Sequence, residues 1–317
     1  MPVELHSATH LPRTGNLERG VEVEFAGRRL RLTNLEKSMY PIAGVTKGQV
    51  VDYYARVAEV MLSHVEGRPL TLKRFPDGIG GAYFFEKRCP GHRPDWVETV
   101  PVWIEQYGTH YEYCVISEPA TLVWLANLAS LEVHPALARA GDLERPTGVA
   151  FDCDPGYPAG LLEVCQVALW LRFLFDRMGL RSFVKSSGSK GIHVYIPLNA
   201  DVTYDRTKAF ARTVAQSLER QSPELATAQV SRARRAGKVL IDWGQNDRHK
   251  TIVAPYSLRA TDPPTVSVPL RWDEVEAALD ARNPDPLVLS PERMLERLER
   301  EGDLFAASAS LRQSLPD

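Results

Sequence analysis

The sequence predicts an α+β protein, a mixed α/β fold with central mixed and antiparallel sheets flanked by helices. Apolar and polar residues alternate from Gly20 to Leu32, which is typical of a β-hairpin. Thr46 and Gln49 form a capping-box pattern before a helical period, and the second half repeats an αβ rhythm. Since no internal repeat or low-complexity linker interrupts the chain, we expect one domain over residues 1–317, with a core at about 20–304 and mobile ends.

The other elements follow in order along the chain. The first half predicts strands at Pro69–Arg74 and Tyr111–Ile116, a helix at Ala120–Ala129, and an apolar run, Leu131–Val133, that leads into His134-Pro135. The second half predicts helices at Leu161–Met178 and Tyr204–Glu219, and strands at Val149–Cys153, Phe183–Lys185, Ile192–Pro197, Lys238–Trp243 and Thr251–Leu258.

Composition places the protein among soluble globular chains. Hydrophobic residues make up 44% and charged residues 25% of the 317 positions, and no long uncharged apolar stretch predicts a membrane span. Met1–Arg19 lacks the apolar core of a signal peptide, so we expect a cytoplasmic protein. The net charge of -2 means that nucleic-acid binding would need local patches, and four cysteines without a Cys-x-x-Cys pair indicate buried or incidental thiols rather than zinc ligands.

Two aspartates one residue apart are the most informative feature. If Val149–Cys153 is a strand, Asp152 and Asp154 point to the same side of its end, where Pro155-Gly156 turns the chain away. Asp242 ends another apolar run and is a third carboxylate if the two strands are neighbours. Carboxylates grouped in this way can hold two divalent cations for phosphoryl transfer. Taken alone, however, the Asp-x-Asp pattern also suits a solvated turn.

A small-residue loop follows, Ser186–His193, between two predicted strands. Its backbone amides, its hydroxyls, Lys190 and His193 can all contact phosphate oxygens, although the spacing is not that of a Walker A loop. A plain hairpin turn would explain its glycines and serines equally well.

Basic residues interleaved with aromatics form a further pattern. Lys73-Arg74 and Lys87-Arg88 bracket Tyr83-Phe84-Phe85, and exposed aromatics can stack on bases. The cation run that includes Arg235 and Lys238 could meet a phosphate backbone. The alternatives are a core aromatic pair and a solvated charged face.

Together, Asp152-Cys153-Asp154, Ser187–His193 and Asp242 resemble the three motifs of the archaeo-eukaryotic primase superfamily. Asn127–Arg139, Gln245-Asn246 and Thr251–Arg259 narrow the resemblance to the polymerase domain of bacterial ligase D, over about Leu32 to Val275. The resemblance implies a primase-like fold and a primase-polymerase that extends DNA ends with manganese, often favouring ribonucleotides. Two residues depart from the usual pattern of that family. Cys153 stands in place of an aliphatic residue, and Ala136 stands in place of tryptophan.

The same resemblance implies a role for each matching residue. Two Mn2+ (or Mg2+) ions would be held by Asp152, Asp154 and Asp242. The residues expected to bind the nucleoside triphosphate are Lys73, His134, Ser187, Ser189, Lys190, His193, Gln245, Lys250 and Arg259. Those expected to bind DNA are Asn34, Lys37 and Lys47 at a 5′-phosphate, Phe84 and Phe85 at the template gap, and Arg74, Arg235 and Lys238.

The leading hypothesis is a template-dependent polymerase that fills short 5′-phosphorylated gaps or extends broken ends. Its expected partners are DNA, NTP or dNTP and, beyond these, a separate DNA ligase and Ku, because we expect no ligase or nuclease module in this chain. Three alternatives stay open: a de novo primase, a noncatalytic module that bridges DNA ends, and a metal-dependent phosphohydrolase.

Overall fold

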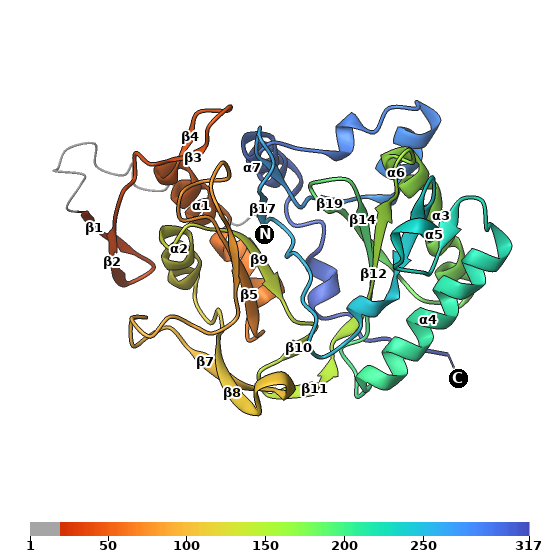
Figure 1. The fold of residues 1–317 in the computed structure, drawn as a ribbon, viewed down its shortest axis with the longest axis horizontal. Helices are drawn as coiled ribbons and strands as arrows, with labels where there is room; N and C mark the ends of the chain where they lie inside the picture. The colour runs from red at the N-terminus through yellow and green to blue at the C-terminus, as the bar shows by residue number, and fades with distance from the viewer. Residues whose placement is uncertain (1–19, 317) are drawn as a thin grey trace. The chain divides into compact units, whose positions relative to one another are not determined.

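The computed structural model describes residues 20–316 and divides the chain into two compact units (Figure 1). Unit 1 consists of the chain up to Pro135 together with Tyr256–Thr265 and Ser290–Gly302. Unit 2 consists of Ala136–Pro255, Val266–Leu289 and Asp303–Asp317. The expectations for Met1–Arg19 lie outside the described residues, and a single domain remains a prediction. No helix among the described residues is long and apolar enough to cross a bilayer.

Unit 1 combines a three-stranded sheet, in the order β6-β5-β9, with helices and two-stranded ribbons. Its helices are α1 (Lys47–Val65), α2 (Pro119–Asn127) and α7 (Pro291–Glu301). Its strands are β1 (Val21–Phe25), β2 (Arg28–Leu32), β3 (Ser38–Tyr40), β4 (Val45–Thr46), β5 (Leu70–Arg74), β6 (Phe84–Glu86), β7 (Thr99–Ile104), β8 (Thr109–Cys114), β9 (Ser130–Pro135) and β17 (Leu258–Arg259). The short β18 (Thr265–Val266) lies where the chain passes from unit 1 to unit 2.

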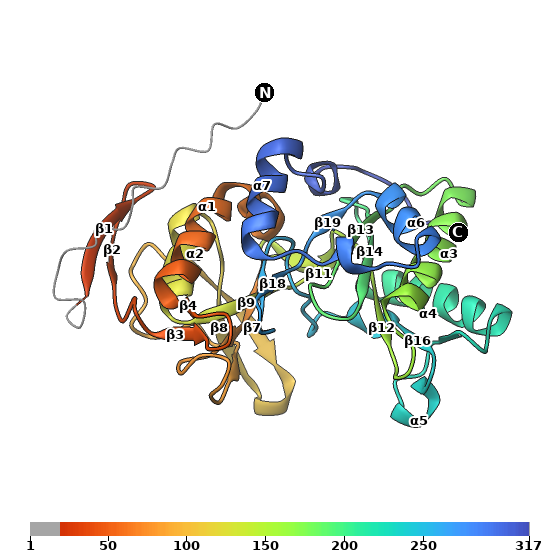
Figure 2. The same cartoon turned by 90° about the horizontal axis from the view of Figure 1, so that it is seen from above.

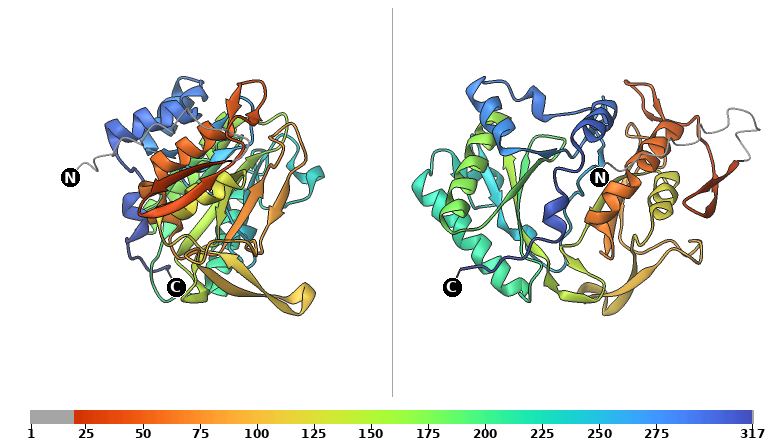
Figure 3. Two further views of the ribbon diagram at one scale, coloured as in Figure 1. Left: turned by 90° about the vertical axis from the view of Figure 1, so that its left-hand side faces the viewer. Right: turned by 180° about the vertical axis from the view of Figure 1, so that it is seen from behind.

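Helix α1 begins where the sequence predicts. The Gln49 amide donates to the Thr46 hydroxyl at 3.4 Å and the Gln49 side chain accepts from the Thr46 amide at 2.8 Å, which completes the capping box. On its buried face, the Tyr54 hydroxyl donates to the Leu131 carbonyl oxygen at 2.6 Å, so the helix is tied to β9. The hairpin predicted at Gly20–Leu32 is confirmed as β1 and β2 (Figure 3).

Unit 2 is built on a six-stranded sheet in the order β15-β16-β12-β14-β13-β19. Its strands are β10 (Ala138–Arg139), β11 (Asp142–Pro146), β12 (Gly148–Pro155), β13 (Phe183–Ser186), β14 (Ile192–Pro197), β15 (Ala226–Thr227), β16 (Val239–Asp242) and β19 (Pro269–Leu270). Its helices are α3 (Leu161–Arg177), α4 (Tyr204–Gln221), α5 (Arg232–Arg235) and α6 (Trp272–Asp280). The predicted α+β class, with mixed and antiparallel sheets flanked by helices, is confirmed.

Helices α3, α4 and α6 lie together on one face of this sheet (Figure 2). Phe151 points from β12 into that layer, where its ring centroid is 5.3 Å from that of Phe175 on α3. Phe151 and Cys153 are completely buried, so they lie on the helix-covered side of β12. Because side chains alternate along a strand, Asp152 and Asp154 point to the opposite side.

Three predictions are wrong. Thr251–Leu258 is not a strand, because Pro255 and a left-handed Tyr256 (φ 66°) break the extended run, leaving an isolated bridge at Thr251 and the short β17. Cys89 and Cys114 form a disulfide, whereas Cys153 and Cys165 are the expected buried thiols. The segment after Leu304 packs instead of being mobile, because Phe305 is buried and the Gln313 amide donates to the Leu198 carbonyl oxygen at 3.0 Å.

Candidate active site and nucleic-acid interface

A row of polar side chains lies on the face of the unit 2 sheet opposite helices α3, α4 and α6. In the antiparallel register Asp152 lies opposite His193 of β14 on one side and opposite Asp242 of β16 on the other. Residues directly opposite one another point to the same face, so the three side chains are neighbours. Asp154, two positions further along β12, shares this face. The predicted pairing of the strands that carry Asp152 and Asp242 is therefore confirmed.

The carboxylates in this row repel one another. Burial raises the pKa of Asp154, and the nearby Asp152 raises it further, against the lowering effect of His193 and Arg235. Burial and Asp152 also raise the pKa of Asp242. A divalent cation relieves such repulsion, and carboxylate oxygens are the ligands that Mn²⁺ and Mg²⁺ prefer, so the donor set fits the expected ions.

The carboxylates are oriented by protein donors. Among the described residues no group of three acidic, histidine or cysteine side chains is arranged to hold a metal ion as it stands. Asp242 accepts from the Gly244 amide at 2.9 Å, and Gln245 Nε2 lies 3.2 Å from Asp242 Oδ2 and 3.5 Å from Asp152 Oδ2. Gln245 thus connects two of the three aspartates.

The loop between β13 and β14 is held by its own serine. The Ser187 hydroxyl accepts from the Ser189 and Gly191 amides at 3.2 and 3.1 Å, while Ser189 and Lys190 are exposed at the tip. A Cβ on Gly191 would lie 2.4 Å from the Cys153 carbonyl oxygen and 2.8 Å from Asp154 Oδ1. The loop therefore packs directly on the carboxylate strand because position 191 has no side chain.

His193 and Lys190 do not converge. His193 is buried on β14, where Nε2 lies 3.1 Å from Asp152 Oδ1 and Nδ1 lies 2.9 Å from the ammonium of Lys185. Lys185 is itself fully buried and donates to the Ser267 hydroxyl at 2.6 Å. Lys185 was missed by the sequence reasoning, although a lysine at the end of the short predicted strand Phe183–Lys185 was a signal for it.

Other predicted residues surround the same carboxylates. Lys250 lowers the pKa of Asp242, and Arg235 lowers that of Asp154, so both cations lie near the row. A Cβ on Gly156 would meet the Arg235 carbonyl oxygen at 2.0 Å, and the Gly156 amide donates to the Lys238 carbonyl oxygen at 2.8 Å. The end of β12 is therefore covered by the basic segment that carries Arg235 and Lys238.

A second cluster in unit 1 gathers around Glu132, whose side chain is 2% exposed. Its oxygens lie 3.4 Å from Lys73 Nζ, 2.9 Å from His134 Nε2 and 3.4 Å from Arg259 Nε, and the Ala260 amide also donates to it. Burial would raise the pKa of Glu132, but the His134 hydrogen bond and the two cations outweigh it and lower the pKa to about 2. Burial lowers the pKa of His134, so the cluster carries two positive charges against one negative charge at neutral pH.

The structure thus brings together Lys73, His134 and Arg259, which are far apart in the sequence. Glu132, which orients all three, was missed by the sequence reasoning. The signal was its position two residues before His134 in the Leu131–Val133 run, because an extended conformation there puts both side chains on one face.

The residues predicted to bind a 5′-phosphate also meet in unit 1. The Lys37 amide donates to the Asn34 carbonyl oxygen at 3.0 Å, and the Lys47 amide donates to the Lys37 carbonyl oxygen at 2.8 Å. Lys47 Nζ donates to the Thr33 carbonyl oxygen at 2.7 Å. Burial lowers the pKa of Lys47 to about 8, with Lys37 and Arg74 as further causes. The mutual effect of these cations shows that they form one basic cluster.

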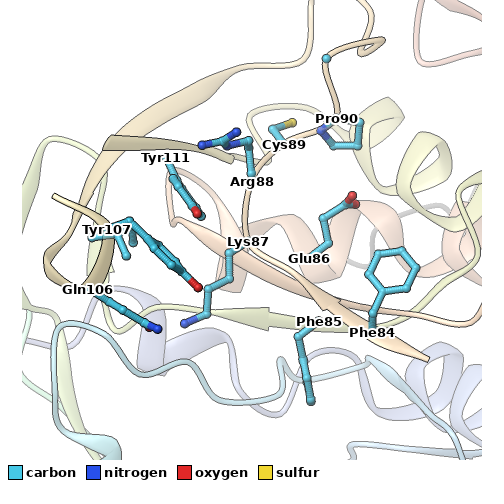
Figure 4. Close-up of a pocket in the computed structure, with 12 residues that line it drawn as sticks. Phe84, Phe85, Glu86, Lys87, Arg88, Cys89, Pro90, Gln106, Tyr107 and Tyr111 are labelled. Carbon is cyan, nitrogen blue, oxygen red and sulfur yellow. The ribbon is translucent and has the colours of Figure 1, made fainter. Parts of the chain in front are cut away.

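Phe84 and Phe85 lie on opposite faces of β6 (Figure 4). Phe84 packs under the Arg74 guanidinium at 5.3 Å, beside the basic cluster. Phe85 lies 6.4 Å from the His134 ring and 5.9 Å from Lys73 Nζ, beside the Glu132 cluster. Both rings are exposed, at 43% and 56%, so the sequence alternative of a core aromatic pair is wrong.

Comparisons with known proteins agree with this architecture. A family model described as LigD, primase-polymerase domain, matches residues 46–305. The solved polymerase domain of ligase D from Mycobacterium tuberculosis, in complex with DNA, aligns with a TM-score of 0.82 at 39% identity, over 89% of this chain and 98% of that one. The fold and the matched family therefore define a nucleotidyltransferase of the primase-polymerase class.

Curated relatives show the same family. The multifunctional non-homologous end joining protein LigD of Mycolicibacterium smegmatis is 41% identical over 280 residues, which cover 88% of this chain and 36% of the relative. The bifunctional LigD protein of Bacillus subtilis is 31% identical over 278 residues, which cover 87% of this chain and 44% of the relative. The chain belongs to the LigD primase-polymerase domain family, and it spans less than half the length of these relatives.

The close approach at Gly191 generates a first prediction. Gly191→Ala would force the β13–β14 loop away from Asp154, because the added Cβ meets backbone at 2.4 Å. We expect a loss of about 1–3 kcal/mol of unfolding free energy in chemical denaturation. Gly141→Ala is the matched control, since its Cβ meets nothing within 4 Å. Equal stability of the two variants would contradict the packing described.

The Glu132 cluster generates a second prediction. Because the pKa of Glu132 is lowered from its ordinary value of 4.5 to about 2 in the fold, its stabilisation is full above about pH 4.5 and is lost as pH falls toward 2. Glu132→Gln should lower the free energy of unfolding by roughly 3 kcal/mol at pH 7. The difference in unfolding free energy between the variant and the parent should shrink between pH 5 and pH 3.

Urea unfolding at several pH values measures this difference. Glu59→Gln, at an exposed position of α1, is the control and should have nearly the same unfolding free energy as the parent at pH 7. If the difference in unfolding free energy between Glu132→Gln and the parent is constant from pH 7 to pH 3, the role assigned to this carboxylate is refuted.

Proposed function

We propose that this protein is a template-dependent polymerase that fills short 5′-phosphorylated gaps or extends broken DNA ends, with a preference for ribonucleotides. The observation that carries the proposal is the row formed by Asp152, Asp242 and Asp154 next to the β13–β14 loop. The M. tuberculosis domain was solved with DNA, and the curated relatives are named as end joining proteins, which supports DNA as the substrate.

The three aspartates would hold two divalent cations. Held there, two such ions would supply activation of an attacking 3′-hydroxyl and stabilisation of the charge on the departing pyrophosphate. Gln245 would leave the carboxylates it now contacts and become available to the nucleotide. Lys250 and Arg235 add positive charge near the row, where phosphate oxygens would gather.

Each unit contains residues that are proposed to bind a nucleoside triphosphate, and each set is described by itself. In unit 2, the proposed contacts are Ser187, Ser189 and Lys190 of the loop, with His193 beneath them. In unit 1, Lys73, His134 and Arg259 carry an excess positive charge that suits phosphate oxygens, and Glu132 keeps them oriented. A neutral His134 can hydrogen-bond a hydroxyl or a phosphate without adding charge.

DNA would be positioned by the basic cluster and by the aromatic pair. Asn34, Lys37 and Lys47 would bind the 5′-phosphate across the gap, and Phe84 and Phe85 would stack on the template there. Arg74 contacts Phe84 and raises the positive potential at Lys47, so it would link the two subsites. Arg235 and Lys238 would contact the phosphate backbone. A separate DNA ligase and Ku would act beside this chain.

Primer extension tests the catalytic proposal. On a gap of one to three nucleotides with a 5′-phosphate and Mn²⁺, Asp152→Asn/Asp154→Asn should lose at least about 100-fold in extension rate, because metal ligation is removed. Asp176→Asn, an aspartate exposed on α3, is the control and should extend normally. Parallel reactions with ribo- and deoxyribonucleotides measure the preference for the 2′-hydroxyl.

Other outcomes of this assay would indicate a different function. Chains started on unprimed single strands indicate a primase, and release of orthophosphate without extension indicates a phosphohydrolase. Tight binding to the gapped DNA without extension by the parent protein indicates an end-bridging module.

The pKa of Lys47 predicts a pH dependence of 5′-phosphate recognition. At about 8, this pKa leaves Lys47 mostly charged at pH 7 and mostly neutral at pH 9. The ratio of Kd values for gapped DNA with a 5′-hydroxyl and with a 5′-phosphate should therefore fall roughly five-fold between these pH values. Lys47→Arg, which stays charged, should keep its ratio at pH 9. A parent ratio that does not change with pH would exclude Lys47 from the phosphate site.

A further inference from the structure

A fully buried lysine continues the row of carboxylates in unit 2. Lys185 of β13 lies opposite His193 of β14, and His193 lies opposite Asp152 of β12. Because residues directly opposite one another point to the same face, the row that ends at Asp242 begins at Lys185. Lysine is rarely buried completely unless a partner uses its charge or its protons. The proposed polymerase chemistry gives this lysine no role.

Hydrogen bonds around Lys185 determine which atoms carry protons. The Ser267 hydroxyl donates its single proton to the Ser186 carbonyl oxygen at 3.1 Å, so toward Lys185 Nζ, at 2.6 Å, it can only accept. The same Nζ lies 2.9 Å from His193 Nδ1. An ammonium group has protons to donate and no lone pair with which to accept. His193 Nδ1 is therefore the acceptor, and the ring proton belongs on Nε2.

The position of this proton decides what His193 offers to the carboxylates. Its Nε2 faces the row, 3.1 Å from Asp152 Oδ1. A histidine binds a metal ion through a nitrogen lone pair, and it usually donates a proton from its other nitrogen to a carboxylate or a carbonyl oxygen. Lys185 places a donor at that other nitrogen, which is the reverse arrangement. His193 therefore presents a proton to the row instead of a further metal ligand.

The absence of an imidazole ligand affects which cation the row prefers. Carboxylate oxygens suit Mg²⁺ and Mn²⁺, whereas imidazole nitrogen suits Zn²⁺, which sites of nitrogen and oxygen ligands generally bind more tightly than Mn²⁺. A set of carboxylates joined by one histidine would resemble the mixed ligand sets of zinc sites. With Nε2 protonated, the side-chain ligands of the row are oxygens alone.

We propose that Lys185 is a positioning residue that keeps the proton on His193 Nε2 and thereby keeps this histidine from ligating the metal ion. The inference deepens the proposed function and rests on it, because that function assigns the divalent cations to the three aspartates of the row. The Nε2 proton then stays available to a phosphate oxygen of the nucleoside triphosphate, which is the contact proposed for His193. Lys185 acts through His193 and not by contact with the cation.

Nitrogen NMR of the metal-free protein, with isotope-labelled histidine at neutral pH, measures the tautomer directly. Long-range proton–nitrogen correlations of His193 in the parent should show a protonated Nε2 and an unprotonated Nδ1. His193→Asn identifies this signal by its absence. A proton on Nδ1, with or without one on Nε2, would overturn the proposal, because Lys185 would then not be the donor.

Lys185→Met, which keeps the length of the side chain but removes the donor, should convert His193 to a mixture of the two tautomers. Ser182→Ala is the matched control, since it removes a buried hydroxyl just before β13 and should keep the parent pattern. A single Nε2-protonated tautomer in Lys185→Met would overturn the role of the lysine.

Calorimetric titration with Mn²⁺ and with Zn²⁺ tests the consequence for the cation. In Lys185→Met the imidazole can turn a lone pair to the row, so the ratio of the Mn²⁺ Kd to the Zn²⁺ Kd should rise about ten-fold. Lys185→Met/His193→Phe should return to the parent ratio, because the additional ligand is gone. A merely structural defect would weaken both metals and would not be reversed by the second substitution. An unchanged ratio in folded Lys185→Met would overturn the proposal.

Ser267→Ala keeps the proposal testable if Lys185→Met does not fold. This variant removes the hydroxyl that holds Lys185 from the other side and buries no new charge. It should shift the His193 tautomer and the ratio of Kd values in the same direction, by less than Lys185→Met. A parent tautomer together with a parent ratio in folded Ser267→Ala would then overturn the role assigned to Lys185.

These measurements use neither DNA nor triphosphate, so they are separate from the test of the polymerase. Failure of the parent to extend a primer would refute the proposed function, whereas the tautomer and the ratio of Kd values would still judge Lys185. Conversely, normal extension by a parent whose His193 carries its proton on Nδ1 would overturn only the present inference. Asp152→Asn/Asp154→Asn should lose Mn²⁺ binding in the same calorimeter, and Mn²⁺ binding that persists would refute the metal assignment on which the inference rests.

Discussion

The antiparallel register of the β12, β14 and β16 strands is the constraint on which the rest of the structure depends. It places Asp152 directly between His193 and Asp242, with Asp154 two positions further on the same face. A slip of one residue would turn the carboxylates into the helix-covered core and bring Cys153 to the surface. The burial of Phe151 against α3 prevents that slip, so the apolar side of β12 fixes the position of the charged side.

Each unit brings like charges close together, and the sign of the charge is opposite in the two units. In unit 2, aspartates repel one another and a cation would resolve their repulsion. In unit 1, the situation is reversed, because the single carboxylate of Glu132 collects Lys73, His134 and Arg259 and leaves an excess of positive charge. The first arrangement is suited to metal ions and the second to phosphates. In both arrangements the charged groups are at least partly buried, so solvent screens them less than it screens charges on the surface.

Sequence reasoning predicted what depends on local periodicity. The β12 carboxylate pair, the α1 capping box and the β1–β2 hairpin are each determined by residues within a few positions, and all are confirmed. The Cys89–Cys114 bond and the contacts of Glu132 with Lys73 and Arg259 were missed because they join residues whose spacing carries no signal. The strand expected at Thr251–Leu258 failed for a different reason, since a left-handed Tyr256 overrides the apolar composition. The family resemblance supplied Lys73, His134 and Arg259 individually, but not the carboxylate that joins them.

Arg259 reaches Glu132 from Tyr256–Thr265, a segment that follows nearly the whole of unit 2 in the chain. During synthesis on the ribosome, Glu132 and Lys73 therefore emerge long before their third partner. Until that partner arrives, a buried carboxylate lacks part of its compensation, so the Glu132 cluster is completed late. A fragment that stops at Pro135 would contain most of unit 1 but could not complete its charge cluster. Dissection of this protein into independently expressed halves must therefore follow its contacts rather than its linear sequence.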